Sequence, residues 1–157
     1  MLPYFEWMEA SGLGAFFRGN VWAMLSAQVV HVCALGVFAG SVVIVDLRLL
    51  GRGLTDIPLA ELAREAQVWF IGAFLVLFVT GLPQLISYAV REYHSPFFWL
   101  KMETMLIALV FTFTVRRRVT LTDEAHLGTH WPRIVAIVSL GLWTGVTIGG
   151  RLIGVLT

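Results

Sequence analysis

The sequence predicts an all-α integral membrane protein that folds as an up-and-down four-helix bundle. Hydrophobic residues make up 58% of the 157 residues and charged residues only 13%. The mean hydropathy is +0.82, which lies outside the range of soluble domains. Four apolar runs approach or exceed the roughly 20 residues that cross a hydrocarbon core of about 30 Å. Short connections between the runs predict that neighbouring helices are antiparallel.

The first twenty residues predict a short helix that lies in the membrane interface rather than a removable signal peptide. They lack a basic N-terminal region, and they carry Glu6 and Glu9 among aromatic side chains. Aromatic rings are favoured at headgroup depth. The rings expected to anchor the helix there are Phe5, Trp7, Phe16 and Phe17.

The four spans fill almost the whole chain, so we expect one domain over residues 1–157. Asp56 and Pro58 predict a helix start that continues directly into the second span, and Pro83 predicts a kink near the end of that span. In lipid every backbone polar group must be satisfied internally, which favours helices for segments of this length. The expected spans are residues 21–47, 66–90, 97–115 and 134–157.

The distribution of basic residues predicts the orientation in a bacterial inner membrane. Lys and Arg accumulate on the cytoplasmic side of membrane proteins. The first and third connections are rich in arginine, whereas the short second connection holds Arg91. We therefore expect the first and third connections in the cytoplasm and both termini in the periplasm. The arginines of the two basic connections and their flanks are Arg48, Arg52, Arg64, Arg116, Arg117, Arg118 and Arg133.

Several features exclude other classes of function. The single cysteine, Cys33, lies inside a span, so it supports neither a disulfide framework nor a cysteine metal site. A net charge of +1 gives no reason to expect a nucleic-acid partner. His126 and His130 are interpreted as interfacial loop histidines. The arginine run 116–118 is interpreted as a surface anchor that contacts anionic lipid, and Asp46 is expected to pair with Arg48 or with that run.

Polar residues inside the spans are the candidates for function, because they are costly in lipid and face the bundle interior. His31 lies roughly 15 Å from the outer end of the first span, with Gln28 one turn away on the same face. Met105 is expected at nearly the depth of His31. The inner half is expected to hold almost nothing polar before Asp46. We call the predicted set the outer cluster: Gln28, His31, Gln84, Tyr88, Lys101, Glu103 and Arg151.

A pocket built from these residues suits haem b. Neutral imidazole binds haem iron, and helix bundles hold cofactors between facing side chains, so His31 is the expected axial ligand. Lys101 and Arg151 would contact the propionates through charge-assisted hydrogen bonds. Met105 and His94 are the candidates for the second axial position.

Other interpretations stay open at this point. His31 can serve only helix packing through a hydrogen bond. A quinone headgroup can bind His31, Gln84 and Tyr88, and Cu(I) suits His31 with thioether ligands. The chain can also be an accessory or scaffold subunit, and either role implies other membrane subunits or a homo-oligomer as partners. The methionines available to copper are Met24, Met102 and Met105.

The sequence resembles the DUF6644 family of uncharacterised bacterial four-span proteins. The resemblance rests on Trp22 followed by His31 and Gly40, the run 46–51 (DLRLLG), Gly72 and Gly81, the opening 98–101 (FWLK), and Gly150-Arg151. Gln28 stands where an acid is expected. More distantly, the first-span His31 and the third-span Lys101 resemble the superfamily of CopD-type copper-resistance proteins and HemJ-type protoporphyrinogen oxidase. That resemblance implies a haem b site at His31 with Lys101 nearby.

Overall fold

The structure, a computed structural model, describes residues 1–122, 128 and 130–156. The described chain is helical, and four long helical segments are long and apolar enough to cross a membrane, which confirms the all-α bundle. They are α3 (Val21–Leu49), α4 (Leu59–Ser87), the continuous segment α6 (Pro96–Phe111), η1 (Thr112–Arg116) and α7 (Arg117–Leu121), and α8 (His130–Leu156).

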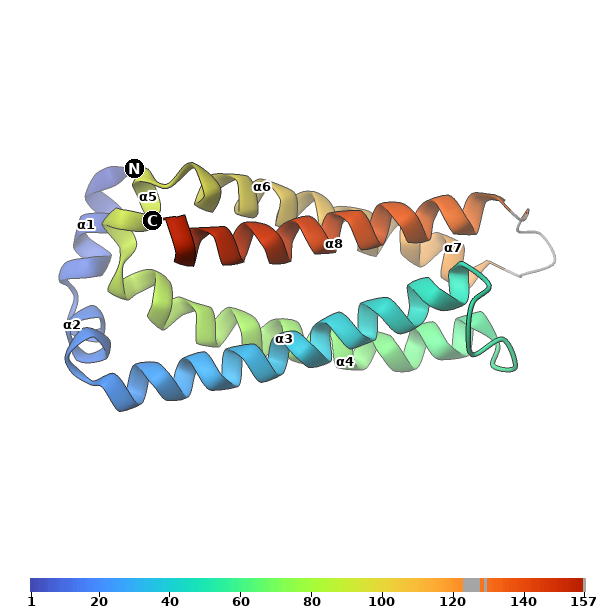
Figure 1. The fold of residues 1–157 in the computed structure, drawn as a ribbon, viewed down its shortest axis with the longest axis horizontal. Coiled ribbons are helices and arrows are strands. Elements are labelled where there is room, and N and C mark those ends of the chain that lie inside the picture. The colour runs from blue at the N-terminus through green and yellow to red at the C-terminus, as the bar shows by residue number, and fades with distance from the viewer. Residues whose placement is uncertain (123–127, 129, 157) are drawn as a thin grey trace.

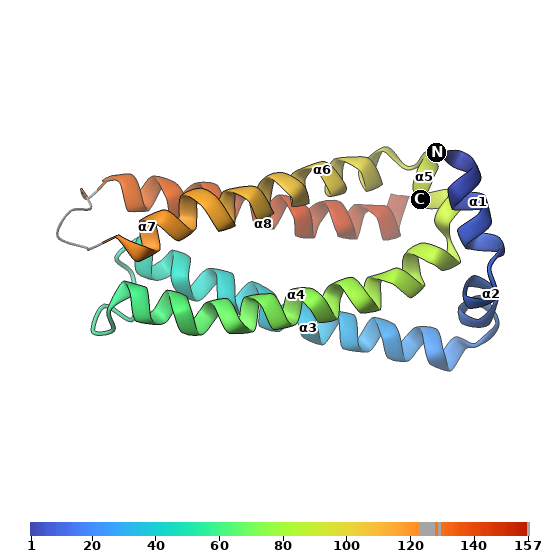
Figure 2. The same ribbon diagram turned by 180° about the vertical axis from the view of Figure 1, so that it is seen from behind.

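The long helices form two antiparallel pairs, α3 with α4 and α6 with α8 (Figures 1 and 2). The pairs meet where α3 packs on α8, and they diverge toward the end that holds both termini (Figure 1). The α3–α4 connection, the end of α7 and the start of α8 lie at the opposite end. We call the two ends of the bundle the termini end and the loop end.

The boundaries differ from those expected in physically simple ways. Pro58 precedes the first turn of α4, so this helix starts at Leu59, where the helix start was predicted, and it continues directly into the second span. No side chain caps it, so Asp56 is not its capping residue. The helix contains Pro83, and its last turns bend toward α5 (Ala89–His94) in Figure 2. The third segment continues to Leu121 because the arginine run stays helical.

Two short helices, α1 (Leu2–Ala10) and α2 (Gly12–Gly19), replace the single N-terminal helix that was expected, and they lie across the termini end (Figure 1). Ser11 separates them with an extended backbone. Its hydroxyl donates to the Met8 carbonyl at 2.6 Å and accepts from the Gly14 N–H at 3.3 Å. One serine thereby ends the first helix and begins the second.

The N-terminal helices also cap the helices beneath them. The Arg18 guanidinium donates to the Ser87 carbonyl at 3.0 Å and to the Glu9 carbonyl at 2.8 Å. The Glu9 carboxylate accepts the Val90 N–H at 2.7 Å. These bonds satisfy backbone groups that the end of α4 and the start of α5 leave unpaired.

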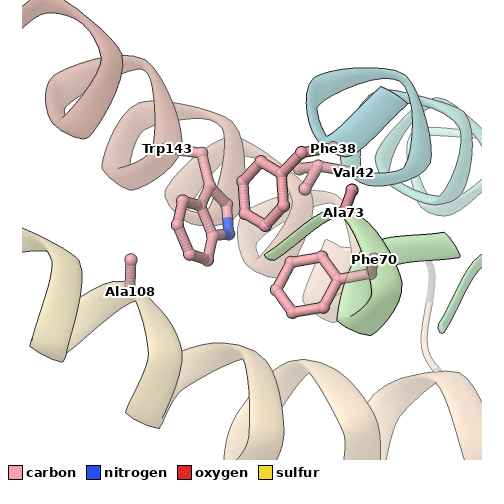
Figure 3. Packing of buried hydrophobic residues seen from close by; sticks show 6 residues of the cluster. All are labelled: Phe38, Val42, Phe70, Ala73, Ala108 and Trp143. Atoms are coloured by element: carbon pink, nitrogen blue, oxygen red, sulfur yellow. The ribbon is translucent and has the colours of Figure 1, made fainter. Parts of the chain in front are cut away.

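The hydrophobic core occupies the middle and the loop end of the bundle. In the middle, Phe38 of α3 packs against Phe70 of α4 and Trp143 of α8, with both ring centroids at 4.7 Å (Figure 3). The Trp143 indole N–H donates to the Thr112 hydroxyl at 3.2 Å. A second cluster lies at the loop end, and its buried residues are Val45, Leu49, Leu59, Val119, Val135 and Ala136.

Candidate functional site

His31 of α3 is half-buried and bonded to the neighbouring helix α4. Its Nδ1 lies 2.9 Å from the Thr80 hydroxyl oxygen, which lies 2.7 Å from the Val76 carbonyl oxygen. A hydroxyl has one proton, and a carbonyl can only accept. Thr80 therefore donates to Val76 and accepts from His31. This assignment puts the proton of neutral His31 on Nδ1 and leaves the lone pair on Nε2.

The His31 ring rests on the backbone of α4 next to Gly81. A Cβ atom at Gly81 would lie 3.5 Å from His31 Cε1, which is ordinary van der Waals contact. The Nδ1 and Cε1 atoms of the ring therefore face α4. Nε2 makes no hydrogen bond with a residue in the described part of the chain. The imidazole is held at one nitrogen and has a free acceptor at the other.

Lys101 of α6 lies along the two glycines near the end of α8. A Cβ at Gly149 would meet Lys101 Cβ at 3.5 Å, and a Cβ at Gly150 would meet Lys101 Cε and Nζ at 3.5 Å. The absence of side chains at these glycines lets the lysine lie flat against the helix. The ammonium interacts electrostatically with His31 across the two helix pairs and with Glu92 of α5.

Glu92 of α5 is the acid that interacts electrostatically with Lys101. Its carboxylate is 3.8 Å from the Arg91 guanidinium. Burial raises the pKa of Glu92 above its ordinary value, and the charges of Arg91 and Lys101 oppose that effect. Lys101 therefore has an acid on one side and an imidazole on the other.

The remaining members of the outer cluster do not converge on His31. Gln28, Glu103 and Arg151 are exposed on the outside of their helices. Gln84 donates to the Thr80 carbonyl of its own helix at 3.2 Å. Tyr88 is exposed and lies under the Arg91 guanidinium, 4.7 Å from the ring centroid.

The two candidates for a second axial ligand lie in different surroundings. Met105 is half-buried on α6. His94 is exposed at the end of α5, where its Nδ1 lies 2.9 Å from the Val90 carbonyl and must donate to it. Of the residues predicted from the sequence, Lys101 interacts electrostatically with His31, and within the described chain no hydrogen bond or ion pair joins any of the others to His31.

Thr80 and Glu92 are the two site residues that the sequence interpretation missed. Thr80 stands one turn before Gln84, on the face of the second span that was already considered, so the i and i+4 spacing could have identified it. Glu92 lies in the short second connection, and no periodic pattern relates it to Lys101.

A second polar centre lies between the pairs at the loop end. Arg116 of η1 donates from Nε to the Asp46 carboxylate at 2.8 Å and from Nη2 to the Val42 carbonyl at 3.1 Å. The expected pairing of Asp46 with the arginine run is confirmed. The interpretation of Arg116 as a surface anchor is wrong, because this side chain is buried inside the bundle.

This centre also corrects the expectation that the inner half holds almost nothing polar. Ser41, Thr112, Thr120 and Ser139 are buried there. Ser139 approaches the Asp46 carboxylate from α8. Within the described residues, Asp46 Oδ2 and Ser139 Oγ are buried and make no hydrogen bond.

The described residues include no group of three His, Cys, Asp or Glu side chains that could hold a metal ion. His130 lies at the start of α8, whereas His126 lies outside the described residues. A haem needs only one or two protein ligands, because the porphyrin supplies the others.

Three comparisons place this geometry among known proteins. A family model described as a family of unknown function (DUF6644) matches residues 4–156. No curated protein matches the chain. No solved structure matches it either.

Proposed function

We propose a function for this chain from its own geometry, because it belongs to the DUF6644 family, whose function is unknown. The protein binds haem b near the termini end of the bundle through Nε2 of His31 and takes part in electron transfer. The observation that supports this proposal is the His31–Thr80 hydrogen bond. Metal-ligating histidines commonly donate their other N–H to a fixed acceptor, which orients the ring and selects its tautomer.

The other residues of the site suit the same group. Lys101 is positioned by Gly149 and Gly150 and can donate to a propionate. Met105 is the preferred second ligand, since it is half-buried on the helix that carries Lys101, whereas His94 is exposed. Haem supplies a one-electron redox centre when it is bound. The Thr80 hydroxyl bonds Nδ1 of His31 and leaves Nε2 unprotonated, and Lys101 supplies the cation that interacts with the imidazole.

A quinol is the second candidate ligand of the site, because His31 offers a hydrogen-bond acceptor and Lys101 offers donors. Nε2 of His31 accepts a hydrogen bond, and the Lys101 ammonium donates. A quinol hydroxyl can donate to His31, whereas an oxidised quinone has only acceptors to offer. A non-catalytic subunit of a larger membrane complex remains the interpretation if no cofactor binds.

In the proposed orientation both termini and His31 lie on the periplasmic side of a bacterial inner membrane. The termini share one end of the bundle, and the arginine-rich connection and arginine run lie at the other end (Figure 1). Fusions of alkaline phosphatase to the C-terminus are expected to be active and fusions of green fluorescent protein dark. The reverse result would invert the orientation.

The visible spectrum of the purified protein tests the proposed cofactor. With adequate haem supply, we expect a b-type spectrum in the dithionite-reduced protein and about one haem per chain in a pyridine haemochrome assay. His31→Ala is expected to lose the Soret band. His130→Ala, at the loop end, is the matched control and is expected to keep it. A colourless wild-type protein, or a Soret band retained by His31→Ala, would contradict the proposal.

Thr80→Val tests whether His31 needs its hydrogen bond to the Thr80 hydroxyl in order to bind haem iron. Removing the acceptor of the Nδ1 proton is expected to weaken haem binding by about 10- to 100-fold. Thr104→Val is the control, because Thr104 makes the same bond to its own helix, to the Leu100 carbonyl at 2.7 Å, but has no bond to His31. Equal haem content in the two variants would remove Thr80 from the site.

A further inference from the structure

A cavity of about 260 Å³ lies at the loop end, on the opposite half of the bundle from His31. It is bounded by α3, by the first turns of α4 and by the segment from η1 to α7. At about 30 Å³ per water, its volume is on the order of ten water molecules. It has room for a small polar group and the first atoms attached to it.

Small side chains on one helix leave this space open. Ala60, Ala63 and Ala66 line the cavity from α4, so the opposing helix α7 is not met by bulky groups there. Ala60 is exposed. Phe113 and Leu121, which line the cavity from η1 and α7, are exposed as well, so its mouth lies between α4 and the segment from η1 to α7. The ribbons of α4 and α7 lie toward the viewer in Figure 2, on one side of the bundle. In a membrane this direction faces lipid at the level of the helix ends.

The lining of the cavity is cationic. Arg64 of α4 and Arg117 of α7 lie at its exposed side, and Arg116 lies deeper. Arg116 is already paired with Asp46. In the described part of the chain, Arg64 and Arg117 form no ion pair and no carboxylate lines the cavity. The two arginines at the mouth therefore line the same space without an ion-pair partner among the residues that the structure describes.

The π-helical turn η1 supplies hydrogen-bonding groups to the interior. A π-helix turns less per residue than an α-helix and often occurs at functional positions. Thr112, Arg116 and Thr120 stay on one buried face across this turn. Thr112 and Thr120 line the cavity together with Ser41 and Gln67. These groups can bond the oxygens of an anion that the arginines attract.

We propose that this cavity binds an anionic phosphate group, with Arg64 and Arg117 as its cationic clamp. Arginine suits this role because its planar donors match phosphate oxygens. The lateral mouth, lined by Phe113 and Leu121 as well as by the arginines, favours the headgroup of an acidic phospholipid over a free phosphate. The site is independent of haem binding, which concerns the other end of the bundle.

Native mass spectrometry of the detergent-purified full chain tests the site with a short-chain phosphatidylglycerol. We expect it to bind at least about tenfold more tightly than the matching phosphatidylcholine. The double variant Arg64→Gln/Arg117→Gln is expected to lose this preference. Arg52→Gln, an exposed arginine of the α3–α4 connection that does not line the cavity, is the charge control and is expected to keep it.

Ala60→Trp tests whether the lipid binds inside the cavity or only to the basic surface around it. The indole fills the mouth of the cavity and leaves every charged side chain in place. It is expected to abolish the preference as the arginine double variant does. A preference unchanged in Ala60→Trp, or lost equally in Arg52→Gln, would overturn the proposal, as would equal binding of the two lipids. Competition by inorganic phosphate would identify a free anion as a sufficient ligand, and its failure would identify the lipid headgroup.

Discussion

The two ends of the bundle hold their polar residues in different ways. At the loop end, Arg116 reaches Asp46 from one helix pair to the other, and Trp143 bonds Thr112 between α8 and η1. At the termini end, His31 bonds Thr80 within the pair α3 and α4, and Lys101 rests on α8 within its own pair. The Arg116–Asp46 ion pair of the loop end therefore joins the two helix pairs, whereas the hydrogen bonds of Trp143 and His31 each stay inside one pair.

This difference indicates that the two ends of the bundle have different structural roles. Both buried hydrophobic clusters lie in the middle and at the loop end, so that end joins the pairs. At the termini end the pairs diverge (Figure 1), and α1 and α2 bridge them through caps on α4 and α5 and through ring contacts of Phe5 with Phe98 and Trp99 of α6. A bundle closed at one end and bridged by surface helices at the other can accept a cofactor without breaking its core.

Breaking the buried ion pair is expected to have the largest effect on stability. Asp46→Ala leaves the Arg116 charge buried without its partner, and this should lower the free energy of unfolding by about 3–5 kcal/mol. Unfolding in mixed micelles with increasing dodecyl sulfate measures the change. Asp56→Ala, an exposed acid in the α3–α4 connection, is the control and should stay within about 0.5 kcal/mol of wild type.

The double variant Asp46→Ala/Arg116→Met tests whether the penalty comes from the orphaned charge. Replacing both partners by apolar groups is expected to recover most of the stability lost in Asp46→Ala. A double variant as unstable as the single one would show that Arg116 stabilises the bundle through other contacts, such as its bond to the Val42 carbonyl.

Disturbing the N-terminal bridge is expected to have an intermediate effect. A Cβ at Gly14 would lie 2.8 Å from the Glu9 carbonyl oxygen and 3.3 Å from the Ile86 carbonyl oxygen. Gly14→Ala should therefore push α2 away from α1, and to a smaller extent from α4, and lower the unfolding free energy by about 1–3 kcal/mol. The same unfolding titration measures it.

Gly12→Ala is the matched control for this bridge, since a Cβ there meets nothing within 4 Å. It should leave stability unchanged or slightly improved, because alanine is the better helix former. If the two variants behave alike, the close approach of α2 to α4 does not hold the termini end together, and the contrast between the ends would need another basis.

Hydropathy was sufficient to predict the four spans and their order, because bilayer thickness constrains helix length directly. It could not predict the break at Ser11, since a local hydrogen-bonding choice of one hydroxyl divides that segment. Counting arginines predicts which connections are cytoplasmic, but it does not show that Arg116 turns inward. The π-helical turn changes the phase of the helix at that residue, and a regular helical period does not anticipate it.

The candidate site could also be predicted from the sequence only in part. Single residues such as His31 and Lys101 were identifiable because polar groups are rare in apolar spans. Their mutual relation was not, because it depends on how two helix pairs are rotated. Gln28 shares the helix face of His31 by spacing, yet it is exposed, so a shared helix face does not by itself bring a residue into the site.

The smallest expected effect concerns Glu92, the acid beside Lys101. Its pKa is raised, so the folded protein binds this proton more tightly than the unfolded chain. The protonated form therefore favours folding, and this contribution is lost as the pH rises from the ordinary glutamate range through the raised pKa. Glu92→Gln should flatten that part of the profile of thermal midpoint against pH. The control Glu6→Gln, at an exposed acid of α1, should follow wild type.

A wild-type midpoint that rises over the same pH interval, or a Glu92→Gln profile as steep as that of wild type, would show that burial at the termini end does not govern this carboxyl group. The termini end would then be more accessible to water than the loop end. This difference in water access would be larger than the bonds between the helix pairs at the two ends imply.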